Sequence, residues 1–421
     1  MPERRLSRRQ FFILSSMLGT AAALQACQLL SRSTTQPVSQ LSTSIPTGTN
    51  TASAGTPTEV GASTEVGANT LIVGATTATP TATATPDQLP GRPVSPLFPS
   101  PTPTPTPYPP GPPSKLGLFL TRFHPQIFDI IEQGQPPLIK TLELDPNFAR
   151  GIKELAPKTI LIGRMFEADQ LNLEADPLPL ARQFVERLLP LATEPTRLAA
   201  FDAWEGYNEP VADTPDKMKR LADFEAERVR LLAERGVRSV VGNFATGHPP
   251  LELWPDFGPA LAATRQYNGY LGLHEYSAPI MQFGYGALQL DNGSDQGDEG
   301  WLTMRYRKAY RHYLNSMGYG QLPLLITECG VDGLVGNRPG PAEARGWQDF
   351  IQTWLDNGLR NDPSGVYMDQ LIWYDGQLRQ DKFVKGATIF EAGASPGWES
   401  YDILGRTGEL LQQYLAVHPQ P

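Results

Sequence analysis

Short apolar runs rich in β-branched residues recur along the second part of the chain, and stretches with helical periodicity separate them. Strands that alternate with helices pair into a parallel sheet, and eight of them favour a (β/α)8 TIM barrel of the α/β class. The main alternative is an open doubly wound sheet, but no GxGxxG or P-loop motif follows any run. The predicted strands are Leu116–Leu120, Leu138–Leu142, Thr159–Gly163, Ala199–Tyr207, Ser239–Asn243, Leu271–Tyr276, Leu322–Glu328 and Gln370–Tyr374.

Two of the intervening segments, 179–192 and 216–236, carry clear amphipathic helix patterns. Gly236 is placed to cap the carboxyl end of the second helix. The charged run Asp223–Arg235 within it is interpreted as a solvated outer face.

The first 27 residues have the layout of an export signal: a basic start, an apolar stretch and small residues before Cys27. The apolar stretch is too short to span a membrane, which takes roughly 20 residues. SRRQFFI (Ser7–Ile13) resembles a twin-arginine export signal, and LQAC (Leu24–Cys27) resembles a bacterial lipobox. These resemblances imply export in the folded state, lipid on Cys27 and an extracytoplasmic, membrane-anchored protein. The alternatives are an uncleaved signal anchor or a cytoplasmic protein with an apolar N-terminus.

Residues 28–113 differ in composition from the rest, with Thr, Ser, Pro, Ala and Gly dominant. Such a segment buries too little apolar surface to offset its ordering entropy, so we expect a disordered tether with a stiffer proline-rich end. The composition leaves open whether its Thr and Ser residues carry sugars. Residues 114–421 are then one catalytic or binding domain.

Cysteine content and charge exclude several classes of protein. With Cys27 lipidated, Cys329 has no disulfide partner, and we interpret it as a small buried thiol rather than a reactive one. The formal charge of −9 becomes −12 when residues 1–26 are removed, because Arg4, Arg5, Arg8, Arg9 and Glu3 together carry +3. No basic stripe is visible in the sequence, so nucleic acid is not an expected partner.

In a TIM barrel the active site forms at the carboxyl ends of the strands. Two carboxylates that face one cavity from different strands suit the cleavage of a glycosidic bond, because their environments separate their pKa values. The side chains expected at these ends are Arg122, His124, Arg164, Asn208, Glu209, Asn243, His274, Tyr276, Glu328, Trp373 and Asp375.

Asn-Glu-Pro after the fourth predicted strand and Glu328 at the end of the seventh resemble the clan A glycoside hydrolases, the 4/7 barrels. His-Glu-Tyr on the sixth strand and a Trp on the eighth strengthen the resemblance. It implies a retaining mechanism in which Glu209 is the acid/base and Glu328 the nucleophile. It further implies that Asn208 binds the sugar 2-hydroxyl, that Tyr276 orients Glu328 and that Trp373 stacks beneath the sugar. His274, Asn243 and an arginine, either Arg122 or Arg164, would complete the substrate contacts, and Asp375 is undecided.

We therefore expect an enzyme that cleaves β-linked oligo- or polysaccharide outside the cytoplasm, with no cofactor and no metal. The alternative is a carbohydrate-binding lipoprotein on the same barrel without turnover. A metal-dependent hydrolase would need a ligand cluster that five scattered histidines do not supply. The loop 283–301 lacks the spacing of a calcium loop, and Trp398 and Tyr401 are candidate outer stacking residues.

Overall fold

A computed structural model describes residues 108–283, 297–336 and 338–421. In these residues eight parallel strands close into a barrel in sequence order, and β8 pairs with β1. The fold is the predicted (β/α)8 TIM barrel. The strands are β1 (Leu116–Leu120), β2 (Leu138–Thr141), β3 (Ile160–Gly163), β4 (Ala203–Glu205), β5 (Ser239–Phe244), β6 (Tyr270–Ser277), β7 (Leu324–Val331) and β8 (Val384–Ala392).

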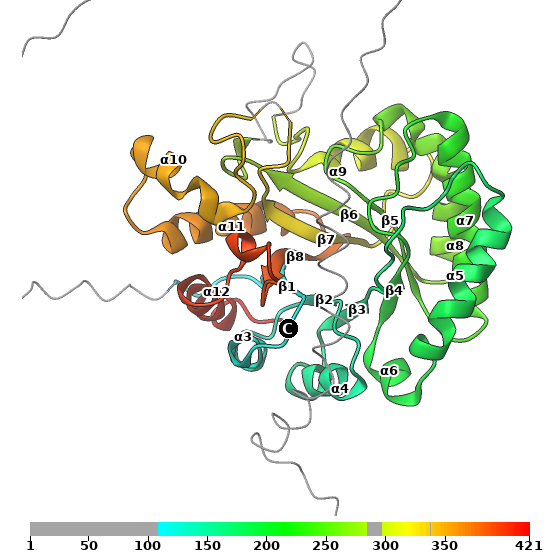
Figure 1. Ribbon diagram of the computed structural model, residues 1–421, viewed down its shortest axis with the longest axis horizontal. Coiled ribbons are helices and arrows are strands. Elements are labelled where there is room, and N and C mark those ends of the chain that lie inside the picture. The colour runs from blue at the N-terminus through cyan, green and yellow to red at the C-terminus, as the bar shows by residue number, and fades with distance from the viewer. Residues whose placement is uncertain (1–107, 284–296, 337) are drawn as a thin grey trace, which may run out of the picture. The chain divides into compact units, whose positions relative to one another are not determined.

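Helices surround the strand barrel (Figure 1). Six of them begin in the same way, with a side chain that caps the first turn followed at once by proline, as at Asp145, Asp176 and Asp362. The α-helices are α3 (Pro125–Gly134), α4 (Pro146–Leu155), α5 (Pro177–Ala192), α6 (Pro195–Ala200), α7 (Pro215–Ala233), α8 (Gly258–Gln266), α9 (Arg305–Ala309), α10 (Ile351–Asp356), α11 (Pro363–Leu378) and α12 (Arg406–Ala416). Shorter helical turns are η1 (Leu251–Phe257), η3 (Tyr310–Leu314), η4 (Trp347–Phe350) and η5 (Glu399–Tyr401).

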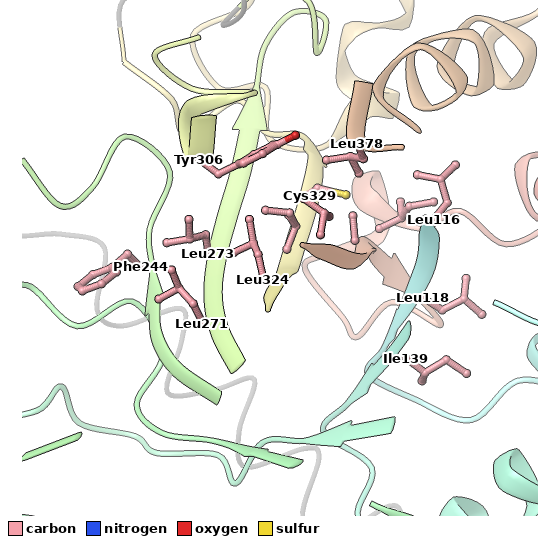
Figure 2. Close-up of a cluster of buried hydrophobic side chains, with 14 of the residues drawn as sticks. Leu116, Leu118, Ile139, Phe244, Leu271, Leu273, Tyr306, Leu324, Cys329 and Leu378 are labelled. Carbon is pink, nitrogen blue, oxygen red and sulfur yellow. The ribbon is translucent and has the colours of Figure 1, made fainter. Parts of the chain in front are cut away.

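Alternating strand residues divide the core into two layers. One cluster lies inside the barrel and consists of Leu138, Ile162, Ala203, Val240, Tyr270 and Leu325. The other lies between strands and helices, and Figure 2 shows part of it, including Leu116, Leu118, Ile139, Leu271, Leu273, Leu324 and Cys329 with Leu378 of α11. Two residues beyond Leu138 and Ala203, the inward positions are Lys140 and Glu205, so the barrel interior becomes charged toward its carboxyl end.

The predicted eighth strand, Gln370–Tyr374, is wrong: these residues lie in α11. Asp362 accepts a hydrogen bond from the Gly365 amide and starts that helix, with Pro363 at its first position. The helix is buried on most of its surface, so its apolar residues form a run without a polar face. The eighth strand is instead Val384–Ala392, where an exposed Lys385 and Gly386 interrupt the apolar pattern.

The fourth strand is also shorter than predicted. Ala199 and Ala200 belong to α6, and the strand covers only Ala203–Glu205. The other six predicted strands agree with the structure to within three residues at each end.

The interpretation of Asp223–Arg235 as a solvated face is wrong at two positions of α7. Glu225 and Arg228 are fully buried, and Nη2 of Arg228 lies 2.6 Å from Oε2 of Glu225. Arg228 also donates to the carbonyl oxygens of Val240 at 2.7 Å and Trp204 at 3.4 Å. This buried ion pair therefore joins α7 to β4 and β5.

The leader with Cys27 and the tether as far as residue 107 lie outside the described residues. Residues 108–113, assigned to the tether by composition, contact the barrel domain: the Tyr108 ring packs edge-on against Tyr414 of α12 at 5.4 Å, and the Gly111 amide donates to the Val417 carbonyl at 3.1 Å. The chain thus enters the domain beside the amino end of β1. Within the described ranges, no helix has both the length and the apolar character needed to cross a membrane.

Candidate active site

A buried ionic layer separates the apolar barrel interior from the carboxyl ends of the strands. Nζ of Lys140 lies 3.0 Å from Oε2 of Glu205 and 2.9 Å from Oε1 of Glu328. The same ammonium group lies 4.6 Å from the ring centroid of Phe119. Charged side chains are rarely buried without partners. In this layer Lys140 is the partner that holds the Glu328 carboxylate from the side of the apolar barrel interior.

Glu209 and Glu328 lie together at the carboxyl ends of β4 and β7. One carboxylate oxygen of Glu209 and one of Glu328 are within 4.8 Å of each other. Glu209 has the positive backbone φ of 48°, and its amide donates to the Asn243 carbonyl of β5 at 3.0 Å. The side chain of Glu209 is 36% exposed and that of Glu328 is 8% exposed. Glu209 can therefore meet solvent while Glu328 is enclosed.

Glu328 has donors on both carboxylate oxygens. The Tyr276 hydroxyl donates to Oε2 at 2.8 Å, while Lys140 and Arg164 donate to Oε1 at 2.9 and 3.2 Å. Burial by itself would raise the pKa of Glu328, but His274, Lys140 and Arg164 together outweigh it and lower that pKa to about 2. Glu328 is accordingly a carboxylate at neutral pH.

Only one of the two candidate arginines contacts the acid pair. Arg164 follows β3, and its Nη1 donates to Oδ1 of Asn208 and to Glu328. Arg122 instead donates through Nε to the Gly393 carbonyl at 3.2 Å and through Nη2 to the Ala394 carbonyl. Arg122 holds the backbone after β8, whereas Arg164 connects Asn208 with Glu328.

His274 of β6 lies between the two carboxylates. Its Nδ1 is 2.7 Å from Oε1 of Glu209 and 3.5 Å from Oε2 of Glu328. Tyr276, two residues further along the same strand, faces the same cavity and is fixed by a bond from its amide to the Thr246 hydroxyl at 2.8 Å. The predicted inward pair on the sixth strand is therefore present.

Two other predicted residues have different positions, and two have different contacts. Trp373 and Asp375 are on α11, outside the barrel. Asp375 is buried at the opposite end of the barrel from the acid pair, where it accepts from the Lys115 amide at 2.6 Å and the Tyr414 hydroxyl at 2.7 Å. His124 caps α3 by accepting from the Gln126 amide. Asn243 is wholly buried, and its contact with Glu209 is through its carbonyl.

The aromatic residue at the end of the true eighth strand is Phe390. Its ring centroid lies 5.2 Å from that of Phe119, 6.2 Å from Tyr276 and 5.5 Å from Trp398. Trp398 is half-buried, and its role as an outer stacking residue stays a prediction. Tyr401 is buried and donates its hydroxyl to Asp332 at 2.7 Å, so it is not an exposed stacking surface.

Sequence reasoning missed Lys140, Glu205 and Phe390. A signal for the first was present, because a lysine in the four-residue buried run Leu138–Thr141 requires a buried negative partner. Glu205, on a strand whose three residues are all buried, gave the matching signal. Phe390 was missed together with its strand.

Glu209, His274 and Glu328 also present the donor atoms that a divalent metal ion would use. Lys140 and Arg164 already place two positive groups against Glu328, and a metal ion there would be opposed by both. The arrangement therefore favours Glu209 and Glu328 as reacting carboxyl groups over their use as metal ligands. The loop 283–301 falls largely outside the described residues.

Cys329, next to Glu328 in sequence, points into the outer core layer (Figure 2). Burial, with smaller contributions from Glu275 and Glu328, raises the pKa of its thiol. The thiol is therefore not activated as a nucleophile.

No protein-family model matches this chain, and no curated protein matches it in sequence. Among solved structures, it is similar to a β-glucuronidase from Ruminococcus gnavus, with 13% identity, a TM-score of 0.43, and 72% of this chain and 50% of that chain covered. It is also similar to a GH128 (subgroup II) endo-β-1,3-glucanase from Pseudomonas viridiflava, with 14% identity, a TM-score of 0.37 and coverage of 72% and 96%. A third is CJP38, a β-1,3-glucanase and allergen of Cryptomeria japonica pollen, with 13% identity, a TM-score of 0.42 and coverage of 69% and 95%. The chain spans about half the length of the β-glucuronidase.

Proposed function

We propose that this protein is a retaining glycoside hydrolase in which Glu328 is the nucleophile and Glu209 the acid/base. The observation that carries the proposal is the separation of their carboxylate oxygens, within 4.8 Å. Carboxyl groups about 5 Å apart suit double displacement, whereas an inverting enzyme needs about 6.5 to 9.5 Å to admit a water molecule.

In the first step, the ionised Glu328 attacks the anomeric carbon and forms an ester with the sugar. The bond from that carbon to the leaving oxygen breaks, and its electron pair takes the proton that Glu209 donates. The low pKa of Glu328 and the exposure of Glu209 to solvent match this division of roles.

In the second step, water attacks the same carbon while the ionised Glu209 removes its proton. The ester bond breaks and Glu328 leaves as a carboxylate, which restores both groups. Lys140, Arg164 and Tyr276 contact that carboxylate and stabilise it as the leaving group. Asn208, held by Arg164, is the proposed partner of the sugar 2-hydroxyl.

The proposed substrate is a β-linked oligo- or polysaccharide outside the cytoplasm, and the proposed anchor is lipid on Cys27. The first rests on the resemblance of the Asn208-Glu209-Pro210 and Glu328 motifs to clan A enzymes. The second rests on the resemblance of Ser7–Ile13 and Leu24–Cys27 to export and lipidation signals.

The test is covalent trapping with a panel of activated 2-deoxy-2-fluoro glycosides that differ in the sugar. Mass spectrometry of the digested protein should find one sugar adduct on the peptide that contains Glu328 and none in the Glu328→Gln variant. An adduct on another carboxylate would overturn the assignment of roles. Carbohydrate binding without any adduct or product would support the alternative, a binding protein without turnover.

A further inference from the structure

A cavity of about 540 Å³ lies at the end of the barrel opposite the acid pair. Its walls come from the amino ends of β3, β6 and β8, from Arg238 just before β5 and from the segment that leads into β7. Sites for small molecules usually have volumes of about 300 to 1,000 Å³. The cavity is therefore large enough for a ligand and separate from the proposed active site.

Three basic side chains from three different elements line this cavity: Arg238, Arg265 of α8 and Lys385 of β8. No aspartate or glutamate lines it, although the chain has 44 acidic residues against 35 lysines and arginines. Arg265 and Lys385 donate to backbone carbonyl oxygens, those of Gly318 at 3.3 Å and Lys382 at 3.2 Å. In the part of the chain that the structure describes, no ion pair compensates any of the three charges.

Arg238 is the most enclosed of the three basic residues. Its Cζ lies 4.8 Å from the ring centroid of Tyr270, and its Nη2 donates to the Tyr270 hydroxyl. Its Nε is buried and has no hydrogen-bond partner among the described residues. Asp202 lies near Tyr270 but already accepts from Lys153 at 2.7 Å and from the Leu161 amide at 2.8 Å. Since buried donors normally have partners, the Arg238 N–H indicates an acceptor that the chain itself does not supply.

The lining also offers apolar surface, from Ile160, Leu322 and Pro323. Cations beside carbon surface suit a small organic anion better than an inorganic one, which would leave the apolar part unused. A carboxylate brings one negative charge, whereas a phosphate monoester brings about 1.5 to 2 at pH 7. Three uncompensated positive groups therefore favour the phosphate, whose oxygens accept from arginine and lysine alike.

We propose that this cavity binds the phosphate monoester of a small organic molecule about the size of a sugar. The phosphate accepts hydrogen bonds from Arg238, Arg265 and Lys385, and the organic part packs against the apolar lining. The site goes beyond the proposed glycosidase activity, because none of its lining residues belongs to the acid pair or contacts it.

The test is isothermal titration calorimetry of the full chain with glucose 6-phosphate, in about 0.15 M salt to screen attraction by surface charge alone. Glucose and inorganic phosphate serve as comparison probes. Wild type should bind glucose 6-phosphate, should not bind glucose, and should bind inorganic phosphate at least about tenfold more weakly. Arg238→Gln should weaken the binding of glucose 6-phosphate by about tenfold or more, since it removes a charge-assisted hydrogen bond.

Arg265→Gln and Lys385→Gln change exposed side chains, so they should fold as wild type does and still weaken binding. The matched control is Arg235→Gln, an exposed position in the turn after α7 that removes one positive charge outside the lining. It should bind as wild type does. An equal loss in this control, or inorganic phosphate bound as tightly as glucose 6-phosphate, would overturn the proposal.

Co-sedimentation with vesicles that contain phosphatidic acid identifies the source of the phosphate, because this lipid has a phosphate monoester as its headgroup. Vesicle binding that glucose 6-phosphate competes away and Arg265→Gln reduces would assign the site to a lipid headgroup. Binding of glucose 6-phosphate without such vesicle binding would assign it to a soluble ligand. Absence of binding in both assays would disprove the site. Neither assay measures turnover, so the outcome is distinct from success or failure of the proposed function.

Discussion

The ammonium nitrogen of Lys140 lies 2.9 Å from Oε1 of Glu328, although 188 positions separate the two residues in the chain. The contact crosses the barrel interior from β2 to β7, and both groups are buried. It links the stability of the barrel to the ionisation of the proposed nucleophile, since each group supplies part of the other's buried counter-charge, beside Glu205 on Lys140 and Arg164 on Glu328.

Substitution of Lys140 by Met should raise the pKa of Glu328, because one of the cations that hold it down is removed. Glu328 must be ionised to attack, so the acid limb of the kcat/KM profile should move to higher pH. Loss of one partner of a buried ion pair also costs about 3 to 5 kcal/mol of stability, and the double variant Lys140→Met/Glu205→Gln should recover part of this. Lys140→Arg, which keeps the charge, serves as the control. An unchanged acid limb in the Met variants would disprove the coupling.

Glu209→Ala should lose activity selectively. Substrates with poor leaving groups need the proton that Glu209 donates, so their kcat/KM should fall by about 10²- to 10⁴-fold. Activated aryl glycosides need little protonation and should retain most of their kcat/KM, and added azide should restore turnover of the glycosyl-enzyme. Steady-state kinetics on both substrate types measures the difference, and equal losses would remove Glu209 from this role.

Glu391 of β8 should make the protein less stable as the pH rises. Burial raises its pKa to about 8, with smaller contributions from Asp402 and Glu328, and Thr121 and Arg122 oppose the shift. The unfolded chain has a glutamate pKa of about 4.3, so the unfolded state releases this proton first and stability falls between that value and about 8. In Glu391→Gln the free energy of unfolding in urea should depend less on pH across this window. Glu399→Gln, at an exposed position of η5, should leave the dependence as in wild type.

Arg228 and Arg230 of α7 allow the effect of a buried ion pair on stability to be compared with that of an exposed one. Arg228→Met leaves Glu225 buried without a counter-charge and should cost about 3 to 5 kcal/mol. Arg230 is 42% exposed and pairs with Glu227 and Glu234 at the surface, so Arg230→Met should cost much less stability than Arg228→Met. Urea denaturation of the two variants measures both, and similar losses would show that the burial of Arg228 has no special weight.

The barrel and its acid pair could be predicted from sequence because strand ends and their residues are local signals. Asn208-Glu209-Pro210 begins three positions after the last residue of β4, and Glu328 follows the apolar run Leu324–Ile326 within β7. The ionic layer could not be predicted in the same way, since whether Lys140 meets Glu205 or Glu328 depends on barrel closure. Barrel closure also determines which arginine reaches the acid pair. Arg122 and Arg164 both follow barrel strands, but they contact different groups.

The prediction of the eighth strand was wrong for a different physical reason. Burial removes the polar face that distinguishes a helix from a strand, so the interior run of α11 had the pattern of a strand, while Lys385 and Gly386 obscured β8. The prediction of Trp373 as the aromatic neighbour of the site failed with it, and Phe390 has that position. The solvated face predicted for α7 failed at Arg228 because a charge pattern does not tell which charges have partners inside.

The chain enters the domain at Tyr108 and Gly111, which contact α12 beside the amino end of β1, and the acid pair lies at the other end of the strands. The linker therefore joins the barrel domain at the end opposite the acid pair. Substrate reaching the proposed catalytic residues then has no need to pass the point where the chain enters the domain.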